Sequence, residues 1–128
     1  MTSPSSKSRI RWCGNSDEVI RQWPEGVRFN IGGDIDRLEN HLEPLDFDSM
    51  GNVLPGVYEL RDRDANRWYR LLYVHLEGLI YVLHCYTKTT NQTAQSDINI
   101  ARDRLKILSE EISDRQKEKK HGKGKKHR

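Results

Sequence analysis

Three basic residues recur along one aromatic and aliphatic stretch of the chain, residues 57–88. Arg61 follows the run VYEL, Arg70 lies inside the run WYRLL, and Lys88 follows the run YVLHCYT. Cations held at neighbouring levels of one surface can bind a phosphate, and Arg suits two-pronged contacts. Tyr86 and His84 lie in the same stretch and add groups able to stack on a base or transfer a proton. From residue types and spacing alone, this set could hold a phosphate.

Arg70 has two interpretations that the residues alone leave open. Its neighbours are large and apolar, so its guanidinium is either on an exposed face or buried with a partner, because an unpaired buried charge is very costly. In the first case it contacts phosphate, and Arg70→Ala removes activity while the fold survives. In the second it covers apolar surface with its stem or forms a structural ion pair with Glu59, and Arg70→Ala unfolds the chain.

The aromatic residues and the histidine also have structural alternatives. The pattern favours Tyr86 as a half-buried strand aromatic and His84 as a hydrogen-bonded structural histidine. Trp68 and Tyr69 are expected in the core or at its rim. Other chemistries lack support: there is no His/Cys/Asp/Glu spacing typical of a metal site and no Gly-rich phosphate loop, so we expect neither metal nor cofactor. Cys13 and Cys85 are interpreted as free buried thiols of a cytoplasmic protein.

The stretch 57–88 is interpreted as three β-strands, at 57–62, 67–76 and 79–87. The links between them, DRDAN and Glu77-Gly78, are short enough to join only antiparallel neighbours. Residues 10–13 predict an added edge strand, and residues 44–55 predict a loop. The predicted fold class is α+β, an antiparallel sheet of three or four strands with two N-terminal helices and one C-terminal helix.

Helices are predicted from apolar periodicity. A short helix follows Asn15 or Ser16, and a second covers about 25–41, whose apolar residues recur every three or four positions as far as Leu45. Together they should pack on one face of the sheet. A third helix begins near Gln95 or Ser96, and its apolar stripe ends at Ile112. Arg102, Asp103, Arg104 and Lys106 fall largely on its wet side.

Length and charge predict one small domain at 10–112, flanked by a disordered N-terminus at 1–9 and a basic disordered tail at 113–128. No segment resembles a signal peptide or a membrane span. Of the 22 Lys/Arg, eight lie in 115–128 with one of the 19 Asp/Glu, so this segment carries +7 and residues 1–114 carry −4. The tail either aids solubility or binds RNA through phosphate contacts. Its basic residues are Lys117, Lys119, Lys120, Lys123, Lys125, Lys126 and Arg128.

Four motifs in order resemble a known family. VYELR at 57–61, N-x-x-YR-x-x-Y at 66–73, YVLHCYTK at 81–88 and D-I-x-x-A-R-x-R at 97–104 resemble the HigB branch of the RelE superfamily. These proteins are toxins of bacterial type II toxin–antitoxin pairs with many phage-borne relatives, and the resemblance covers about residues 10–112.

The resemblance implies a RelE-like fold and metal-independent cleavage of messenger RNA in the ribosomal A site, which inhibits translation and growth. It also implies a cognate antitoxin, a helix-turn-helix protein that forms a heterotetramer with the toxin, and no membrane partner. By matched motif it assigns phosphate and transition-state contacts to Arg61, Arg70 and Lys88, with Tyr86 and His84 beside them.

The chain departs from that family at two places. Relatives usually carry Lys-Lys before the threonine-rich loop and a proline after it, whereas this chain has Lys88-Thr89 and Thr93-Ala94. A second hypothesis follows from this departure and from the charge split. The protein is then a non-catalytic RNA-binding module, or a decayed toxin, that acts through its basic tail.

Overall fold

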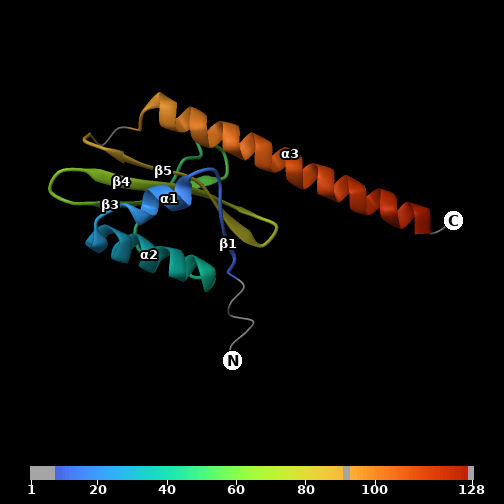
Figure 1. Cartoon of the computed structure of the whole chain (residues 1–128), viewed down its shortest axis with the longest axis horizontal. Helices are drawn as coiled ribbons and strands as arrows, with labels where there is room; N and C mark the ends of the chain where they lie inside the picture. Colours follow the sequence, from blue (N-terminus) through green and yellow to red (C-terminus); the bar gives the residue numbers. More distant parts are fainter. Residues whose placement is uncertain (1–7, 91–92, 127–128) are drawn as a thin grey trace.

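A computed structural model gives the structure of residues 8–90 and 93–126, with side chains described as far as Lys119. One short strand and two helices precede a run of four strands, and a long helix follows (Figure 1). In chain order they are β1 (Ile10–Trp12), α1 (Ser16–Arg21), α2 (Glu25–Glu39), β2 (Phe47–Ser49), β3 (Val57–Arg63), β4 (Trp68–Leu76), β5 (Leu79–Lys88) and α3 (Gln95–Lys126).

The sheet has five strands in the order β1-β5-β4-β3-β2. The α+β class and the β3-β4-β5 meander are confirmed, and the β4–β5 turn is the tight one predicted. Glu77 and Gly78 have φ of 54° and 76°, as the two central residues of a type I′ turn require. The prediction of three or four antiparallel strands is wrong, because β1 pairs with β5 in parallel and β2 lies in the expected loop. Both strands span three residues, too few to show an alternating pattern.

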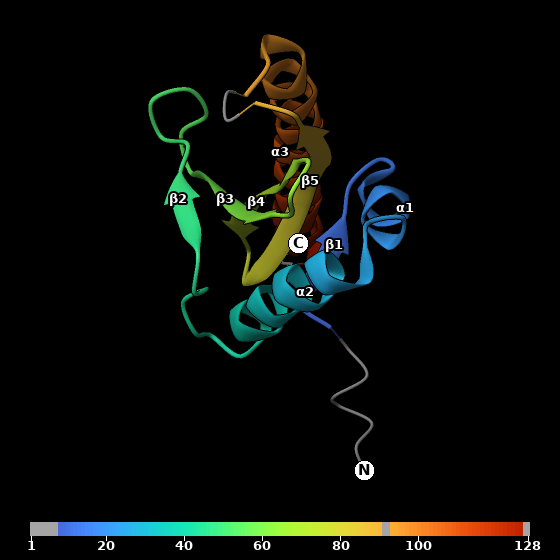
Figure 2. The same cartoon turned by 90° about the vertical axis from the view of Figure 1, so that its left-hand side faces the viewer.

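Helices cover both faces of the sheet, with α1 and α2 on one side and α3 on the other (Figure 2). Two apolar clusters result, as each face of the sheet needs a partner layer to exclude water. The cluster on the α2 side contains Trp23, Val27, Ile31, Tyr69 and Tyr73 among others. The cluster on the α3 side contains Leu72, Leu83, Tyr86, Ile98 and Leu108 among others. The predicted helix pair on one face is therefore confirmed.

Helix α2 ends two residues earlier than predicted. The last helical residue is Glu39, and the chain then turns through His41, which has a left-handed φ of 62°. Leu42 and Leu45 continued the apolar period but lie outside the helix, and both are exposed. The pair Gly32-Gly33 lies inside α2 without ending it.

Helix α3 extends well beyond the predicted end at Ile112, so the expectation of a segment without regular structure is wrong up to Lys126. Lys, Glu, Gln and Arg are good helix formers, and no proline interrupts the segment. Because this segment has few hydrophobic residues, it has no apolar face to bury, but it can still form a helix. At the other end, Ser8 and Arg9 both hydrogen-bond Glu39, so these two residues of the expected disordered N-terminus are held in place. Residues 1–7 and Arg128 lie outside the described residues.

Arg104 fastens α3 to the sheet. Its Nη1 donates to the Leu83 carbonyl at 2.8 Å, and its Nη2 donates to the Asn15 side chain at 3.0 Å. Gly14, with φ of 55°, lies so close that a Cβ there would come within 2.4 Å of the guanidinium carbon. Arg104 was expected on the wet side of the helix. The structure instead uses it to join α3, β5 and the loop before α1.

The far end of α3 makes few contacts with the rest of the described chain. Arg115 and Gln116 both approach Glu77 in the β4–β5 turn, and past them the helix projects beyond the sheet in Figure 1. A chain ending at Gln116 should lose helical circular dichroism at 222 nm, while its melting temperature changes by about 3 °C or less. A chain ending at Lys106 also loses the buried Leu108 and Ile112 and should melt much lower. Equal destabilisation by the two truncations would contradict this description of the helix.

Candidate functional site

A β-bulge in β5 decides which residues share a face of the sheet. Leu72 of β4 pairs with His84, but the next residue, Tyr73, pairs with Val82, so Leu83 is an extra residue in β5. A bulge of this kind opposes two residues to one and resets the alternation of side chains along the strand.

The two apolar clusters show the effect of the bulge. Before it, Tyr81 and Leu83 face α3 and Val82 faces α2; after it, Cys85 faces α2 and Tyr86 faces α3. The period of two along a strand then places His84 and Lys88 on the same side as Tyr86. If strict alternation continued through Leu83 without a bulge, these three side chains would point toward α2.

The bulge brings the five predicted catalytic residues onto one face. In the strand register Arg61 lies opposite Arg70, and Arg70 lies opposite Tyr86, so one row crosses β3, β4 and β5. The pair Lys88–Trp68 lies on one side of this row, and the pair His84–Leu72 lies on its other side. Residues directly opposite one another in antiparallel strands share a face. We call this surface the cationic face; it consists of Arg61, Arg63, Trp68, Arg70, His84, Tyr86 and Lys88.

Arg70 forms the buried ion pair that the sequence left as an alternative. Its Nη1 lies 2.7 Å from both carboxylate oxygens of Glu59, and the two residues are 4% and 2% exposed. Its guanidinium carbon also lies 5.3 Å from the centre of the Trp68 ring. A group this buried offers little surface to a ligand. We therefore expect Arg70→Ala to destabilise the fold, contrary to the expectation that the fold would survive this substitution.

Arg61 is more accessible and lies beside two carboxylates, one in β2 and one just before it. Its side chain is 32% exposed, with Nε 3.1 Å from Asp46 and Nη1 3.5 Å from Asp48. The Glu59 carboxylate lies 3.9 Å away on the same strand. One row along, Arg63 covers the Trp68 ring at 5.0 Å, a cation–π contact. Arg61 can bind a phosphate only if it also keeps its contacts with Asp46 and Asp48 or gives them up.

Asp97, at the start of α3, links two of the predicted residues. One of its oxygens lies 2.9 Å from His84 Nε2, and the other lies 3.0 Å from Lys88 Nζ. The Lys88 side chain is 23% exposed, whereas His84 is buried. Burial lowers the pKa of His84, and Asp97 opposes that shift. His84 is accordingly neutral at pH 7, and its burial and its contact with Asp97 are those expected of the hydrogen-bonded histidine favoured from the sequence.

Tyr86 lies between the histidine and the loop before α3. Its ring stacks on His84 at 5.1 Å, and its hydroxyl is 3.2 Å from Thr93 Oγ1. Burial raises the pKa of Tyr86 to about 12, so the hydroxyl keeps its proton at neutral pH. Tyr86 can donate a proton or a hydrogen bond from this position but is not suited to accept a proton as a base.

The carboxylates of the site were not predicted as site residues, except that Glu59 was named as a partner for Arg70. Each predicted cation has one: Glu59 for Arg70, Asp97 for Lys88, and Asp46 with Asp48 for Arg61. The D-I-x-x-A motif contained Asp97 but gave no sign that it lies beside β5. No group of His, Cys, Asp or Glu able to hold a metal occurs among residues 8–90 and 93–126.

The family model for Phage derived protein Gp49-like (DUF891) matches residues 18–106, which include every residue of the cationic face. The chain belongs to the Gp49-like family. This is a RelE-like toxin family, whose members are commonly toxins of toxin–antitoxin pairs. Among curated proteins, none matches this chain in sequence. Within the described part of the chain, no helix has the length and hydrophobicity needed to cross a membrane.

The basic tail of this Gp49-like protein lies far from the cationic face. Asp97 marks the face at the start of α3, and Lys117 is 20 residues further along the same helix, about 30 Å at the usual rise. Lys117 and Lys119 are exposed. Lys120, Lys123, Lys125 and Lys126 follow in the helix, but their side chains and the whole of Arg128 lie outside the description. Lys117 and Lys119 therefore cannot contact the same phosphate as the predicted catalytic residues.

The Glu59–Arg70 pair gives a stability prediction. Arg70→Met leaves a buried carboxylate without its cation and should lower the free energy of unfolding by about 3–5 kcal/mol, measured by urea denaturation. The double variant Glu59→Leu/Arg70→Met removes both charges and should recover most of the loss. A single variant as stable as wild type would show that the pair is dispensable.

The His84 pKa gives a second prediction. NMR titration of its ring should give a pKa below the unfolded value of about 6.5, and Asp97→Asn should lower it further, since the carboxylate favours the charged ring. The unfolded chain then binds the extra proton first, so this residue's contribution to stability is complete above about pH 6.5 and declines as the pH falls below it. A pKa above 6.5 in the wild-type protein would contradict this assignment.

Proposed function

We propose that this Gp49-like protein is a HigB-type toxin, a ribosome-dependent endoribonuclease that cleaves messenger RNA and so arrests translation and growth in the cytoplasm. The observation that supports this most is the gathering of Arg61, Arg70, Lys88, Tyr86 and His84 on one face by the bulge at Leu83. These are the residue types that metal-independent RNA cleavage needs, and they lie inside the segment matched to a RelE-like toxin family.

The mechanism proposed uses the RNA's own 2′-hydroxyl as the nucleophile. The 2′-hydroxyl loses its proton to solvent water as its oxygen forms a bond to phosphorus, the bond to the 5′-oxygen breaks, and a 2′,3′-cyclic phosphate results. Arg61 and Lys88, the most accessible predicted cations, contact the phosphate and the charge that develops on it. Tyr86 keeps its proton at neutral pH and, in this mechanism, supplies it to the leaving 5′-oxygen.

The buried residues act beneath this surface. Glu59 holds Arg70 under the Trp68 ring, and Asp97 fixes the position of Lys88 against β5. Fixed charges stabilise a transition state without reorganising when charge develops, which is the reason for building them into a sheet. Asp97 also competes with a phosphate for Lys88, so the substrate must share that ammonium or displace the carboxylate.

The partners proposed are those of a type II pair. A cognate helix-turn-helix antitoxin holds the toxin inactive in a heterotetramer, and the ribosome presents the messenger in its A site. The exposed lysines at the far end of α3 contact ribosomal RNA away from the cleavage site. Such contacts release counterions, so removing the segment lowers ribosome affinity and reduces its salt dependence without changing the chemical step.

A second function is favoured by one specific observation, the carboxylate partners of all three predicted cations. A site whose cations are already neutralised attracts phosphate weakly. In that case the protein is a non-catalytic RNA-binding module, or a decayed toxin, and α3 beyond Gln116 carries its activity.

Expression in bacteria tests the two functions. Wild type should arrest growth and cleave messenger RNA, and Lys88→Ala should lower the cleavage rate on the order of 100-fold, by analogy with loss of one transition-state donor. Arg61→Ala should act in the same direction. Arg21→Ala is the matched control, because Arg21 is an exposed arginine on α1, and it should remain toxic.

The outcomes separate cleanly because Lys88 and Arg61 are partly exposed and their loss should leave the fold intact, as thermal melts will check. Intact messenger RNA with wild type would exclude the nuclease. If truncation after Gln116 removes the growth effect and Lys88→Ala does not, the second function holds. Rescue of growth by a neighbouring gene for a small helix-turn-helix protein would identify the antitoxin.

A further inference from the structure

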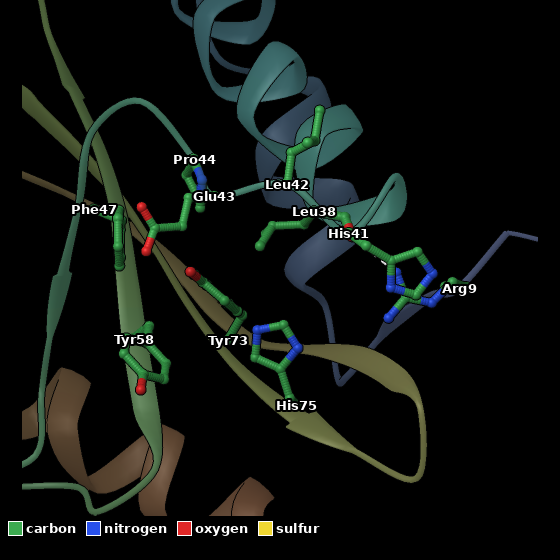
Figure 3. A pocket seen from close by; sticks show the side chains of 10 residues that line it. All are labelled: Arg9, Leu38, His41, Leu42, Glu43, Pro44, Phe47, Tyr58, Tyr73 and His75. Atoms are coloured by element: carbon green, nitrogen blue, oxygen red, sulfur yellow. Dashed lines mark hydrogen bonds between the residues drawn. The ribbon is translucent and has the colours of Figure 1, made fainter.

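A hollow of about 370 Å³ opens on the face of the sheet opposite the cationic face. It lies at the end of α2, under the chain that leads from His41 to Pro44, and side chains of β2, β3 and β4 form its other wall (Figure 3). Its volume lies in the range of small-molecule and side-chain binding sites. None of the residues predicted to act on RNA lines it.

Four rings form one continuous wall of this hollow. Phe47 lies 6.2 Å from Tyr58, Tyr58 lies 5.8 Å from Tyr73, and Tyr73 lies 5.6 Å from His75, measured between ring centres. Ring faces carry the negative part of the quadrupole and attract cations. A wall of this kind favours a cation with an apolar stem over an anion.

The charged groups around the hollow also favour a cationic ligand. Figure 3 shows the Glu43 carboxylate extending over the hollow toward Phe47, with the Tyr73 hydroxyl directed into the same space. Burial raises the pKa of Tyr73 above its usual range, and the negative charges of Asp34 and Glu43 add to that shift. The space beside the Tyr73 hydroxyl therefore has a negative potential.

The basic residues of the lining lie at the other end of the hollow from Glu43, where Figure 3 shows Arg9 beside His41. Arg9 donates to the carbonyls of Leu38, Glu39 and Gly78, so its guanidinium serves the C-terminal end of α2 and the β4–β5 turn. Burial lowers the pKa of His75, and Arg9 lowers it further, so that ring is neutral at pH 7. An anionic ligand would meet the charge of Arg9 at that end of the hollow, whereas a cation can reach the Glu43 carboxylate at the end beside Phe47.

The rim of the hollow is apolar and exposed. Leu42 lines it and is 51% exposed, and Leu45, beside Pro44 in the chain, is 80% exposed. The Leu45 amide donates to the buried Asp34 carboxylate at 2.8 Å, which holds this part of the chain in place. Large apolar side chains presented on a fixed loop beside a pocket are typical of a protein-binding surface.

We propose that this hollow binds an arginine or lysine side chain of a protein partner whose neighbouring apolar residues cover Leu42 and Leu45. The stem of the basic side chain lies against Leu38 and the aromatic wall, and its charged end meets Glu43. A nucleic acid is a poor occupant, because Glu43 and Asp34 repel its phosphates. The proposal does not depend on nuclease activity, since the hollow and the cationic face lie on opposite sides of the sheet.

An NMR titration of the full chain tests the proposal. The probe is N-acetyl-arginine methylamide, and the control is the citrulline analogue, which has nearly the same shape without the charge. The arginine probe should shift the ring signals of Tyr58, Tyr73 and His75 saturably. Glu43→Gln should weaken binding about tenfold, the usual effect of losing one charge-assisted hydrogen bond. Glu110→Gln, which removes an exposed carboxylate on α3, should have no effect.

Three results would overturn the proposal. Equal binding of the citrulline analogue would show that charge plays no part. No saturable shift of these rings by the arginine probe would show that the hollow does not take a basic side chain. Uridine monophosphate shifting the rings where the arginine probe does not would identify a nucleotide site instead.

Discussion

The buried pair of Glu59 and Arg70 is the interaction on which the cationic face depends. Two charges at 2% and 4% exposure must stay together, because either one alone would be a buried, unpaired ion. The pair spans β3 and β4, supports the Trp68 ring from one side and lies beside Arg61 in the same row. Arg61 and Lys88, the more accessible cations, are therefore carried by a sheet whose centre cannot shift without separating that pair.

The carboxylates define how this face can work. Asp97 contacts both Lys88 and His84, and Asp46 and Asp48 contact Arg61. Such partners keep long side chains in one geometry, which favours transition-state stabilisation, but they also compete with the substrate for the same cations. The substrate must therefore bind more favourably than these carboxylates do. Additional binding energy from a second surface is one way to achieve this. The exposed basic end of α3, about 30 Å away, is such a surface.

The opposite face of the sheet favours ligands of the opposite charge. One side presents guanidinium and ammonium groups, whereas the other has a ring-lined hollow with Glu43 beside it and exposed leucines at its rim. A five-stranded sheet covered only in part by its helices can carry both surfaces without interference. An RNA contact and a protein contact can then be made at the same time, which suits a protein proposed to bind RNA and to be held by a partner.

The sequence by itself determined the α+β class, the β3-β4-β5 meander, the turn at Glu77-Gly78 and the packing of the two N-terminal helices on one face of the sheet. These follow from local period and short links, which the order of residues shows directly. It also offered the Glu59–Arg70 pair as an alternative. Only the tertiary structure decided between burial and exposure for Arg70, because that choice depends on what covers the strand. The bulge at Leu83 and the approach of Asp97 to Lys88 needed strand register and helix docking, which local patterns do not contain. The helical tail was missed because low hydrophobicity limits burial and does not prevent a helix.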